Sequence, residues 1–564
     1  PDSNNCLGGA KTMMKACKPA LLAALAVLIA VSVARGQHVH GHDPSEEVGR
    51  VNFRISCSPA AQLQFNRAVA WLHSFEYEEA EKAFSDIVVT DPRCGIGYWG
   101  IAMSQYHPLW VPPTANQLQK GTSAVEKAKL TGARTQRERD YIAAIEVFYK
   151  DFNQLDHRAR TFAYSKAMEQ LYRRYPSDDE AGVFYALTLI ATGTLVNDKT
   201  YANEKKAAQI LNRVRAREPQ HPGVTHYLIH SYDYPALARL ALPAARSYAK
   251  IAPASAHARH MPSHIFTRLG LWQEAIRSNL GAEAAAKEFA MRNHLSDVWD
   301  EQFHAMDYLA YAYLQGAQDK QALGVLDELN EIKKAEPETF KVAYAFTAIR
   351  TRYALERRRW DEAAKLTLPP DSLGGFPWDQ FRWAEANIQF ARAVGAARSG
   401  DVASAREAVE RLAAIRQALV EVKGDYDWAK QVDIQHRAAS AWLAHAEGKD
   451  EEALRLMRAA ADLDDATDKH PVTPGAILPA REMLGDLLSE LNQPAQALKE
   501  YQKSLEISPN RFNSIYGAAR AAELAKNHAK ARAYYEKLVA LTEQADSSRP
   551  ELEQSRKYLA KRGH

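Results

Sequence analysis

The chain contains 564 residues, of which 46% are hydrophobic and 25% are charged, as in folded proteins built from several domains or from one long repeat array. Lys and Arg number 72 while Asp and Glu number 69, so the formal net charge is only +3, and the two signs are interspersed along the chain. This balance, without a long basic stretch, argues against a nucleic-acid partner.

The first predicted element is an export signal. Residues 13–18 include two lysines, residues 20–33 are almost entirely apolar, and two small residues follow two positions apart. This order predicts that residues 1–36 are upstream residues and a secretory signal peptide, cut before Gln37. Because the apolar run is short for a spanning helix, an uncleaved anchor is the weaker alternative. We therefore expect a periplasmic or secreted protein with no stable membrane span after signal cleavage.

The next segment, residues 37–57, is predicted to be a His-rich N-terminal linker that begins Gln-His-Val-His-Gly-His-Asp. Short histidine tracts bind copper or zinc as flexible recruiting arms, but they also occur as inert linkers, and the sequence leaves both interpretations open. On the first interpretation the accessory metal ligands are His38, His40 and His42.

Two cysteines, Cys57 and Cys94, remain after the predicted leader is removed. Each lies just before the first helix of a predicted unit, and the two units are successive. A disulfide between them is therefore sterically plausible in an oxidising compartment, with two buried free thiols as the alternative. Their spacing matches no zinc-knuckle pattern.

The rest of the chain is predicted to fold as repeated pairs of helices. On the second helix of each pair, a small residue is followed by a bulky one four later, an apolar or small one seven later and a proline or chain break twelve later. The first residues of these matches are Ala80, Ala207 and Ala497, with weaker copies at Ala241, Ala275, Ala322, Ala363, Ala405, Ala453 and Ala531. The pattern resembles the tetratricopeptide repeat superfamily over most of residues 58–541, and no strand pattern of useful length interrupts it. We therefore predict an all-α fold, an α-solenoid of tetratricopeptide-type helix-turn-helix repeats.

Departures from the repeat period divide this array. A Val-Pro-Pro sequence opens an insertion with extra helices, paired prolines and glycines mark a loop, and two prolines interrupt residues 469–475. The predicted divisions are an N-terminal array at 58–368, with its insertion at 111–160 and a histidine groove at 221–311, a Pro/Gly loop at 369–380, a C-terminal array at 381–545 and a terminal helix at 546–564.

Histidines recur at the same spacing in two neighbouring units. His226 and His230 are four residues apart, and the second pair, His260 and His264, follows the first by 34 residues, which is one tetratricopeptide period. Residues four apart on a helix project from one face about one turn apart. The resemblance implies that the first helices line the concave side of the solenoid, so all four rings are expected to face the groove.

The candidate metal ligands are these four histidines and two more that share a register one turn earlier, His257 and His304. Neutral imidazole suits copper and zinc, and six rings are enough for one or two ions. Further side chains at groove positions or helix ends are expected to complete a metal-ligand shell, orient a ligand or contact substrate. These candidates are Asp233, Asp307, Tyr311, Arg268 and Glu482.

The phrases HYLIHSYDYP, ARHMPSHIFTRLG and LPAREMLGDLL resemble a subgroup of exported bacterial tetratricopeptide proteins. The resemblance implies a fold and a groove, but no reaction. The sequence contains no nucleophile elbow, phosphate loop, dinucleotide fingerprint or His-Glu-x-x-His motif. Two hypotheses follow. One is an exported metalloprotein with copper or zinc in a polyhistidine groove, with enzyme activity left open. The other is a metal-free scaffold that binds a peptide or protein partner along that groove, where the histidines serve contact or packing alone.

Overall fold

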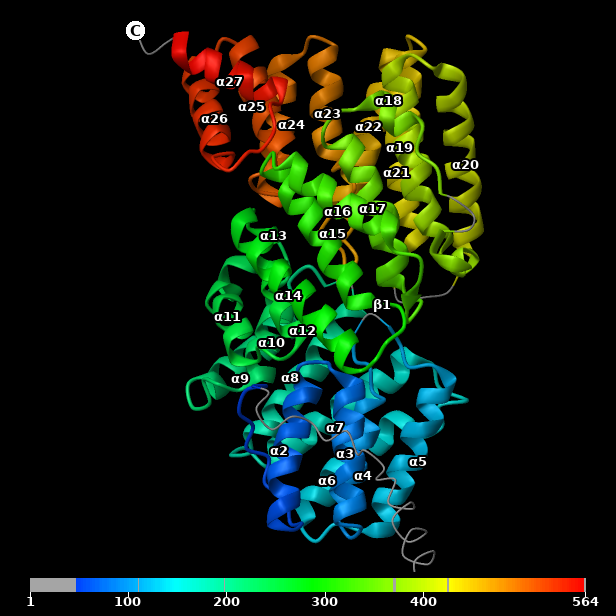
Figure 1. Ribbon diagram of the computed structural model, residues 1–564, viewed down its shortest axis with the longest axis vertical. Helices are drawn as coiled ribbons and strands as arrows, with labels where there is room; N and C mark the ends of the chain where they lie inside the picture. The colour runs from blue at the N-terminus through cyan, green and yellow to red at the C-terminus, as the bar shows by residue number, and fades with distance from the viewer. Residues whose placement is uncertain (1–46, 110, 197, 369–371, 423–425, 562–564) are drawn as a thin grey trace, which may run out of the picture. The chain divides into compact units, whose positions relative to one another are not determined.

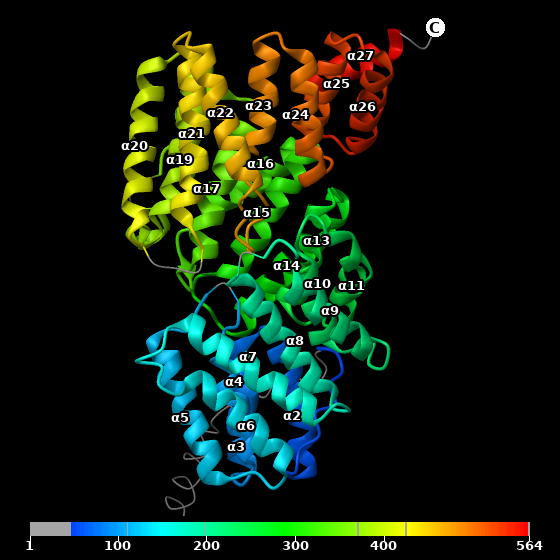
Figure 2. The ribbon, with the colours of Figure 1, turned by 180° about the vertical axis from the view of Figure 1, so that it is seen from behind.

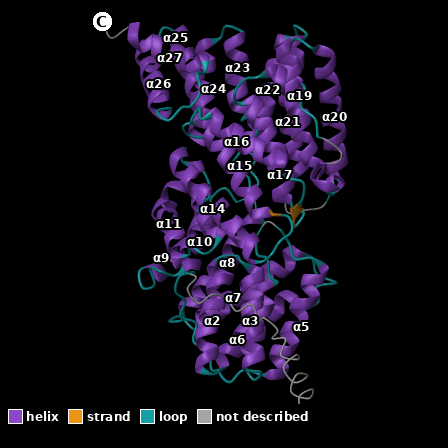
Figure 3. Cartoon of the chain, viewed as in Figure 1, coloured by secondary structure: helices purple, strands orange, loops and turns teal. Residues whose placement is uncertain are grey.

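The structure is a computed structural model that describes residues 47–109, 111–196, 198–368, 372–422 and 426–561. The predicted signal peptide (residues 1–36) and the histidine tip with His38, His40 and His42 lie outside these residues. Helices make up nearly all of the regular structure (Figure 3). Within the described ranges, no helix is both long enough and apolar enough to cross a membrane.

The elements follow one another in a simple order. The described helices up to residue 368 are α2 (Pro59–His73), α3 (Tyr77–Thr90), α4 (Gly95–Ser104), α5 (Ala115–Thr131), α6 (Gln136–Tyr149), α7 (His157–Arg174), α8 (Asp179–Thr194), α9 (Ala202–Arg215), α10 (Pro222–Tyr232), α11 (Ala238–Ile251), α12 (Ala256–His260), α13 (Pro262–Arg268), α14 (Trp272–Arg292), α15 (Asp300–Gln315), α16 (Asp319–Glu331), α17 (Phe340–Leu355) and α18 (Trp360–Ala364). Those that follow are the 3-10 helices η1 (Ser372–Gly374) and η2 (Trp378–Phe381), then α19 (Arg382–Ser399), α20 (Val402–Val420), α21 (Trp428–Ala446), α22 (Asp450–Asp465), α23 (Ala480–Glu490), α24 (Pro494–Ile507), α25 (Phe512–Leu524), α26 (His528–Leu541) and α27 (Pro550–Lys561). Two short strands, β1 (Val298–Trp299) and β2 (Ala335–Glu336), pair in parallel.

Successive helices pack against one another along the chain, as Figures 1 and 2 show for α19 to α22 and for α23 to α26. The small residues that open the repeat fingerprint lie where the paired helices touch. Ala80, Ala207 and Ala497 are all fully buried. An α-helix with one apolar stripe must bury that stripe against a neighbour, and a repeated pair does so by stacking. The predicted all-α solenoid of stacked helix pairs is confirmed.

Helix α15 joins the two large apolar clusters of the chain. Leu309 and Ala312 pack in the cluster formed by the helices from α2 to α16, while Phe303 and Met306 pack in the cluster that continues to α27. These two pairs lie on different sides of the helix, and every residue of α15 except Glu301 is buried. A side chain on this helix is therefore held rigidly.

One predicted helix is broken, and one predicted interruption is a loop. The first helix expected around His260 is split, because α12 ends before Met261 and α13 begins at Pro262. Proline has no N–H to donate and its ring crowds the preceding turn, so it starts a new helix instead of continuing one. The interruption expected at 469–475 lies in the loop between α22 and α23. Both features contribute to the site described below.

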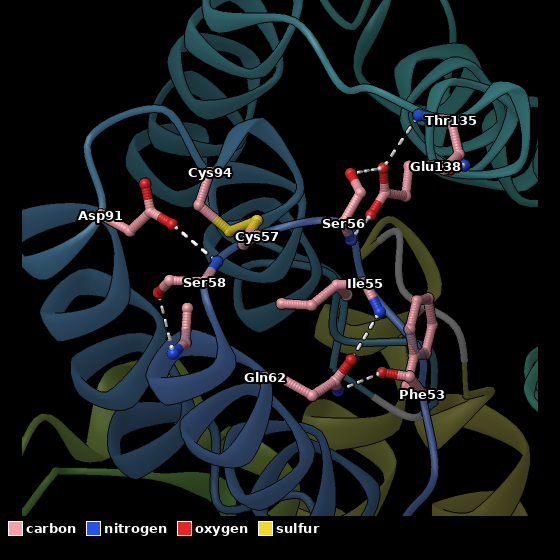
Figure 4. Close-up of a disulfide and its surroundings, with 11 residues drawn as sticks. Phe53, Ile55, Ser56, Cys57, Ser58, Gln62, Asp91, Cys94, Thr135 and Glu138 are labelled. Carbon is pink, nitrogen blue, oxygen red and sulfur yellow. Dashed lines mark hydrogen bonds between the residues drawn. A yellow bond between two sulfur atoms is a disulfide. The ribbon is translucent and has the colours of Figure 1, made fainter.

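Cys57 and Cys94 form a disulfide (Figure 4). The bond ties the segment before α2 to the start of α4, across 37 residues of sequence. Beside it, the backbone N–H of Ser58 donates to Asp91 Oδ2 at 2.9 Å, and the Ser58 hydroxyl accepts from the N–H of Ala61 at the start of α2. Of the two alternatives that the sequence left open, the structure has the disulfide.

Replacing both cysteines by alanine is expected to lower the free energy of unfolding by about 4 kcal/mol, because the bridge restricts the unfolded chain over a loop of this length. Urea unfolding of the wild type and of Cys57→Ala/Cys94→Ala measures the difference. A reductant should shift the wild-type midpoint and leave the double variant unchanged. Equal midpoints under oxidising conditions would contradict the prediction.

Candidate metal centre

Six buried histidines gather in two groups of three. The first trio is His226, His230 and His257, and the second trio is His260, His264 and His304. Within each trio the candidate ligand nitrogens all lie within 4.8 Å of one another, and the six side chains are between 0% and 8% exposed. Helix α10 carries two rings of the first trio. The short helix α12 contributes one ring to each trio, and α13 and α15 complete the second.

This division separates the two histidine pairs that the repeat period relates. The sequence predicted that the two pairs at four-residue spacing face one groove, and it left open whether the six rings hold one ion or two. In the structure each pair stays together but belongs to a different trio. The third ring of the first trio is His257, and the third ring of the second is His304. The break at Pro262 contributes, because it separates the helix that carries His260 from the one that carries His264.

In the first trio three Nε2 atoms converge. The Nε2 of His226 lies 3.0 Å from the Nε2 of His230 and 3.2 Å from the Nε2 of His257. The Nδ1 of His226 lies 2.7 Å from the backbone oxygen of His73. A carbonyl oxygen can only accept, so Nδ1 carries the proton of the neutral ring. The Nε2 of His226 is therefore unprotonated, and its lone pair faces two other imidazoles.

In the second trio, two rings instead of one have an Nδ1 that donates to a protein acceptor. The Nδ1 of His260 donates to Asn279 Oδ1 at 2.7 Å, and the Nδ1 of His264 donates to Asp233 Oδ2 at 3.0 Å. The Asn279 oxygen is the acceptor, because its amide nitrogen already donates to the carbonyl of Ala275. Both neutral rings thus have unprotonated Nε2 atoms, and these face each other at 3.0 Å. Two lone pairs at this distance repel unless a cation lies between them.

Burial disfavours a proton as the cation between the facing Nε2 atoms. Desolvation lowers the pKa of all six imidazoles, and in five of them neighbouring histidines lower it further. A metal ion meets the same geometry without protonating a ring. Two nitrogens bound at about 2.0–2.1 Å to one ion, at angles between 90° and 110°, lie about 2.8–3.4 Å apart. The separations of 3.0 and 3.2 Å fit that range.

The groups that hold the outer nitrogens are those expected around a metal-binding histidine. Metal-ligating imidazoles usually donate their second N–H to a carbonyl or carboxylate, which fixes both tautomer and ring orientation. Here the acceptors are the His73 carbonyl, the Asn279 amide oxygen and the Asp233 carboxylate. Asp233 also accepts from Arg268 Nε at 2.8 Å. Two of the predicted outer residues, Asp233 and Arg268, therefore lie beside the second trio.

An aromatic ring covers each trio. The ring centroid of Phe75 lies 4.4 Å from that of His226, and it also packs on His230 and His257. Phe75 has a φ of 59°, a left-handed conformation that is costly for a bulky residue and tends to occur at functional sites. Tyr308 packs on all three rings of the second trio, and its hydroxyl donates to the carbonyl of Val472.

Sequence reasoning missed both covering rings and the Asn279 amide. Tyr308 lies four residues after His304 on α15, so the same spacing rule that selected the histidines would have found it. Phe75 and Asn279 carry no such signal. They reach the trios through contacts between helices, which no local pattern encodes.

The remaining predicted outer residues take part in buried ion pairs and a hydrogen bond elsewhere. Asp307 pairs with Arg352, although it lies only three residues after His304. The Tyr311 hydroxyl accepts from Arg511 Nη1 at 2.7 Å, and Glu482 pairs with the same guanidinium at 2.9 Å. These contacts join α15 to α17, α23 and α25, so the groove register did not carry these side chains to the histidines.

A third buried group, formed by His73, Glu180 and His221, is a hydrogen-bonded network. The Nε2 atoms of both histidines contact the Glu180 carboxylate at 2.9 Å. The Nδ1 of His73 contacts the Tyr227 hydroxyl, and the Nδ1 of His221 accepts from the N–H of Val224. Every ring nitrogen is thus engaged with the protein. The network fixes α2, α8 and α10, and with them the carbonyl that orients His226.

Glu180→Ala is expected to lower the free energy of unfolding by about 3 kcal/mol, because it leaves two buried imidazoles without their shared acceptor. Thermal or urea unfolding measures the loss. Glu169→Ala is the control, since its carboxylate forms ion pairs on the surface of α7 that contribute little. Equal stability of the two variants would contradict a structural role for the network.

Two neighbouring cavities lie near the histidines, and the smaller one adjoins the first trio. The small cavity, of about 140 Å³, is lined by His230 of the first trio together with Asp233, Arg268 and Lys469. The large cavity, of about 640 Å³, is lined by aromatic side chains and by the loop between α22 and α23. Residues on the wall of both are Tyr201, Arg268, Tyr426, Asp468, Lys469 and His470. The small cavity therefore connects the first trio with a volume of the size of small-molecule sites.

Comparisons with known proteins assign no family. No family model matches the chain, and no curated protein matches it. Among solved structures, a monomeric mutant of IFIT1 with m7Gppp-AAAA covers 86% of this chain and 98% of its own, at 12% identity and a TM-score of 0.36. Human IFIT1 dimers with m7Gppp-AAAA and with PPP-AAAA cover 80% and 79% of this chain and 90% of their own, at 12% and 13% identity and TM-scores of 0.37 and 0.34. Likeness this distant carries no argument about function, so the function must be argued from the geometry of this chain.

Proposed function

We propose that this chain is an exported metalloprotein that holds two transition-metal ions, copper or zinc, one in each histidine trio. The single observation that carries the proposal is the pair of Nε2 atoms of His260 and His264, which face each other at 3.0 Å while both Nδ1 protons are donated outward. Imidazole nitrogens are ligands suited to both metals.

The accessibility of the first trio supports a metal-dependent enzyme over a closed structural site. Three protein ligands leave a coordination position for water or substrate, as in catalytic zinc sites, whereas structural zinc ions are held by four. His230 lines the small cavity, so a small molecule in that cavity can approach the first trio. The second trio lies beneath Tyr308, with its His260 and His264 almost completely buried.

The disulfide supports the proposed export to the periplasm or the cell exterior. Disulfides persist in oxidising compartments and are rare in the cytosol. The bond between Cys57 and Cys94 agrees with the signal peptide predicted for residues 1–36.

Metal analysis of the untagged protein tests the proposal. We expect two equivalents of copper or zinc per chain by inductively coupled plasma mass spectrometry, and a loss of both in His226→Ala/His260→Ala. The control is His436→Ala/His445→Ala, which removes two histidines of α21 outside the trios. A preparation that holds no metal and takes up none on titration contradicts the proposal. The metal-free scaffold for a peptide or protein partner would then be the better account.

A further inference from the structure

We propose that the two cavities bind a small organic carboxylate, held by Lys469 and Arg268 on their shared wall, with its apolar body in the large cavity. This carboxylate would be the substrate class of the metal ion in the first trio. A reaction of the carboxylate therefore rests on the proposed function. Binding itself requires the side chains of the cavities alone.

Asp233 is a buried carboxylate between two cations. It pairs with Arg268 at 2.8 Å and with Lys469 at 3.7 Å. One negative charge against two positive charges means that Asp233 alone does not neutralise both of its cationic partners. Burying an uncompensated cation is costly, and an anionic ligand removes that cost.

Lys469 retains the capacity to bind such a ligand. Its ammonium group has three donors, of which one reaches the backbone oxygen of Pro471 at 3.1 Å. Burial lowers its pKa to about 7, with Asp233 opposing the shift and Arg268 adding to it, as expected for a cation short of negative partners. A bound carboxylate would stabilise the charged form.

The other two cations of the large cavity, Lys199 and Arg481, are already paired. Lys199 forms an ion pair with Asp468 at 2.6 Å, and Arg481 forms one with Asp465. The Asp464 carboxylate accepts from the N–H of Ala480 at the start of α23. The two cations that share one carboxylate lie at the end of the large cavity that adjoins the small one. A carboxylate bound there would lie beside the small cavity, whose lining also includes His230.

The walls of the large cavity suit an apolar, ring-containing body. Its aromatic lining includes Tyr201, Trp272, Tyr311, Tyr344, Tyr426 and Trp428. Apolar and aromatic walls with a few placed charges are typical of small-molecule sites, and about 640 Å³ lies within their usual range of about 300–1,000 Å³. The carboxylate fixes the orientation and the aromatic walls supply the contact area.

Calorimetric titration of the full chain tests the inference with three acids and their uncharged primary amides: acetate, benzoate and 3-phenylpropionate. We expect at least one of the two ring-containing acids to bind ten-fold or more tightly than its amide. Lys469→Met should weaken that acid at least ten-fold and leave its amide unchanged, while Lys469→Arg should restore most of the affinity. The control is Lys199→Met, which removes a lysine of the same cavity that is already paired with Asp468.

Two results would overturn the inference: no acid binds more tightly than its amide, or Lys469→Met binds the acid as the wild type does. The comparison of acid with amide in the wild type decides the matter even if the methionine variant fails to fold. Metal is measured in the same preparations. Selective acid binding by a protein without metal would refute the proposed metal centre and leave this inference standing, and the opposite pattern would refute only this inference.

Discussion

His260→Ala is expected to remove one of two bound metal ions and to leave the other in place. The substitution deletes a ligand of the second trio, whose Nε2 faces that of His264 at 3.0 Å. The first trio keeps all three of its rings. Loss of an outer-shell partner alone costs about 10- to 100-fold in metal affinity, so loss of a direct ligand is expected to exceed about 100-fold. Metal stoichiometry and competition with a chelator of known affinity measure the effect.

The matched variant is His226→Ala, which should empty the first trio and spare the second. His445→Ala is the control, because that ring is partly exposed and pairs with Asp450. A single ion lost completely in both His226→Ala and His260→Ala would show that the six histidines serve one shared site. That outcome would favour one ion shared by the two pairs, an alternative that the sequence left open.

Removing the metal is expected to lower the unfolding temperature strongly. Ions that bind only the folded chain stabilise it by about 4 kcal/mol each when present at a thousand times their dissociation constant. Without them the buried Nε2 atoms of each trio face one another unshielded, and the lowered pKa of each ring disfavours a proton as replacement. Calorimetry of the protein before and after dialysis against a strong chelator, and after metal is restored, measures the loss.

The same treatment of His226→Ala/His260→Ala supplies the control. This double variant is expected to unfold at one temperature with or without the chelator, since each trio lacks a ligand. A wild-type protein whose unfolding temperature is unchanged by chelation would be inconsistent with occupied trios. A chelator effect of equal size in the double variant would place the metal elsewhere in the chain.

Much of the candidate site could be predicted from spacing. The four-residue interval places His226 and His230 on one face of α10, because backbone hydrogen bonds within a helix fix that periodicity whatever surrounds it. The repeat of 34 residues placed the next pair on the following unit. The register shared by His257 and His304 selected the two remaining rings. All six candidate ligands come together in the structure, although in two groups.

The sequence by itself determined the helical repeat and the ring positions along each helix, since both depend on interactions between residues close in the chain. Only the tertiary structure decided which rings share a trio, through the break at Pro262 and the angles at which α10, α12, α13 and α15 pack. The tertiary structure also pairs Asp307 with Arg352 and places the His73 carbonyl against His226, which is 153 residues away in sequence. Such partners meet through packing between distant segments, which no local period records.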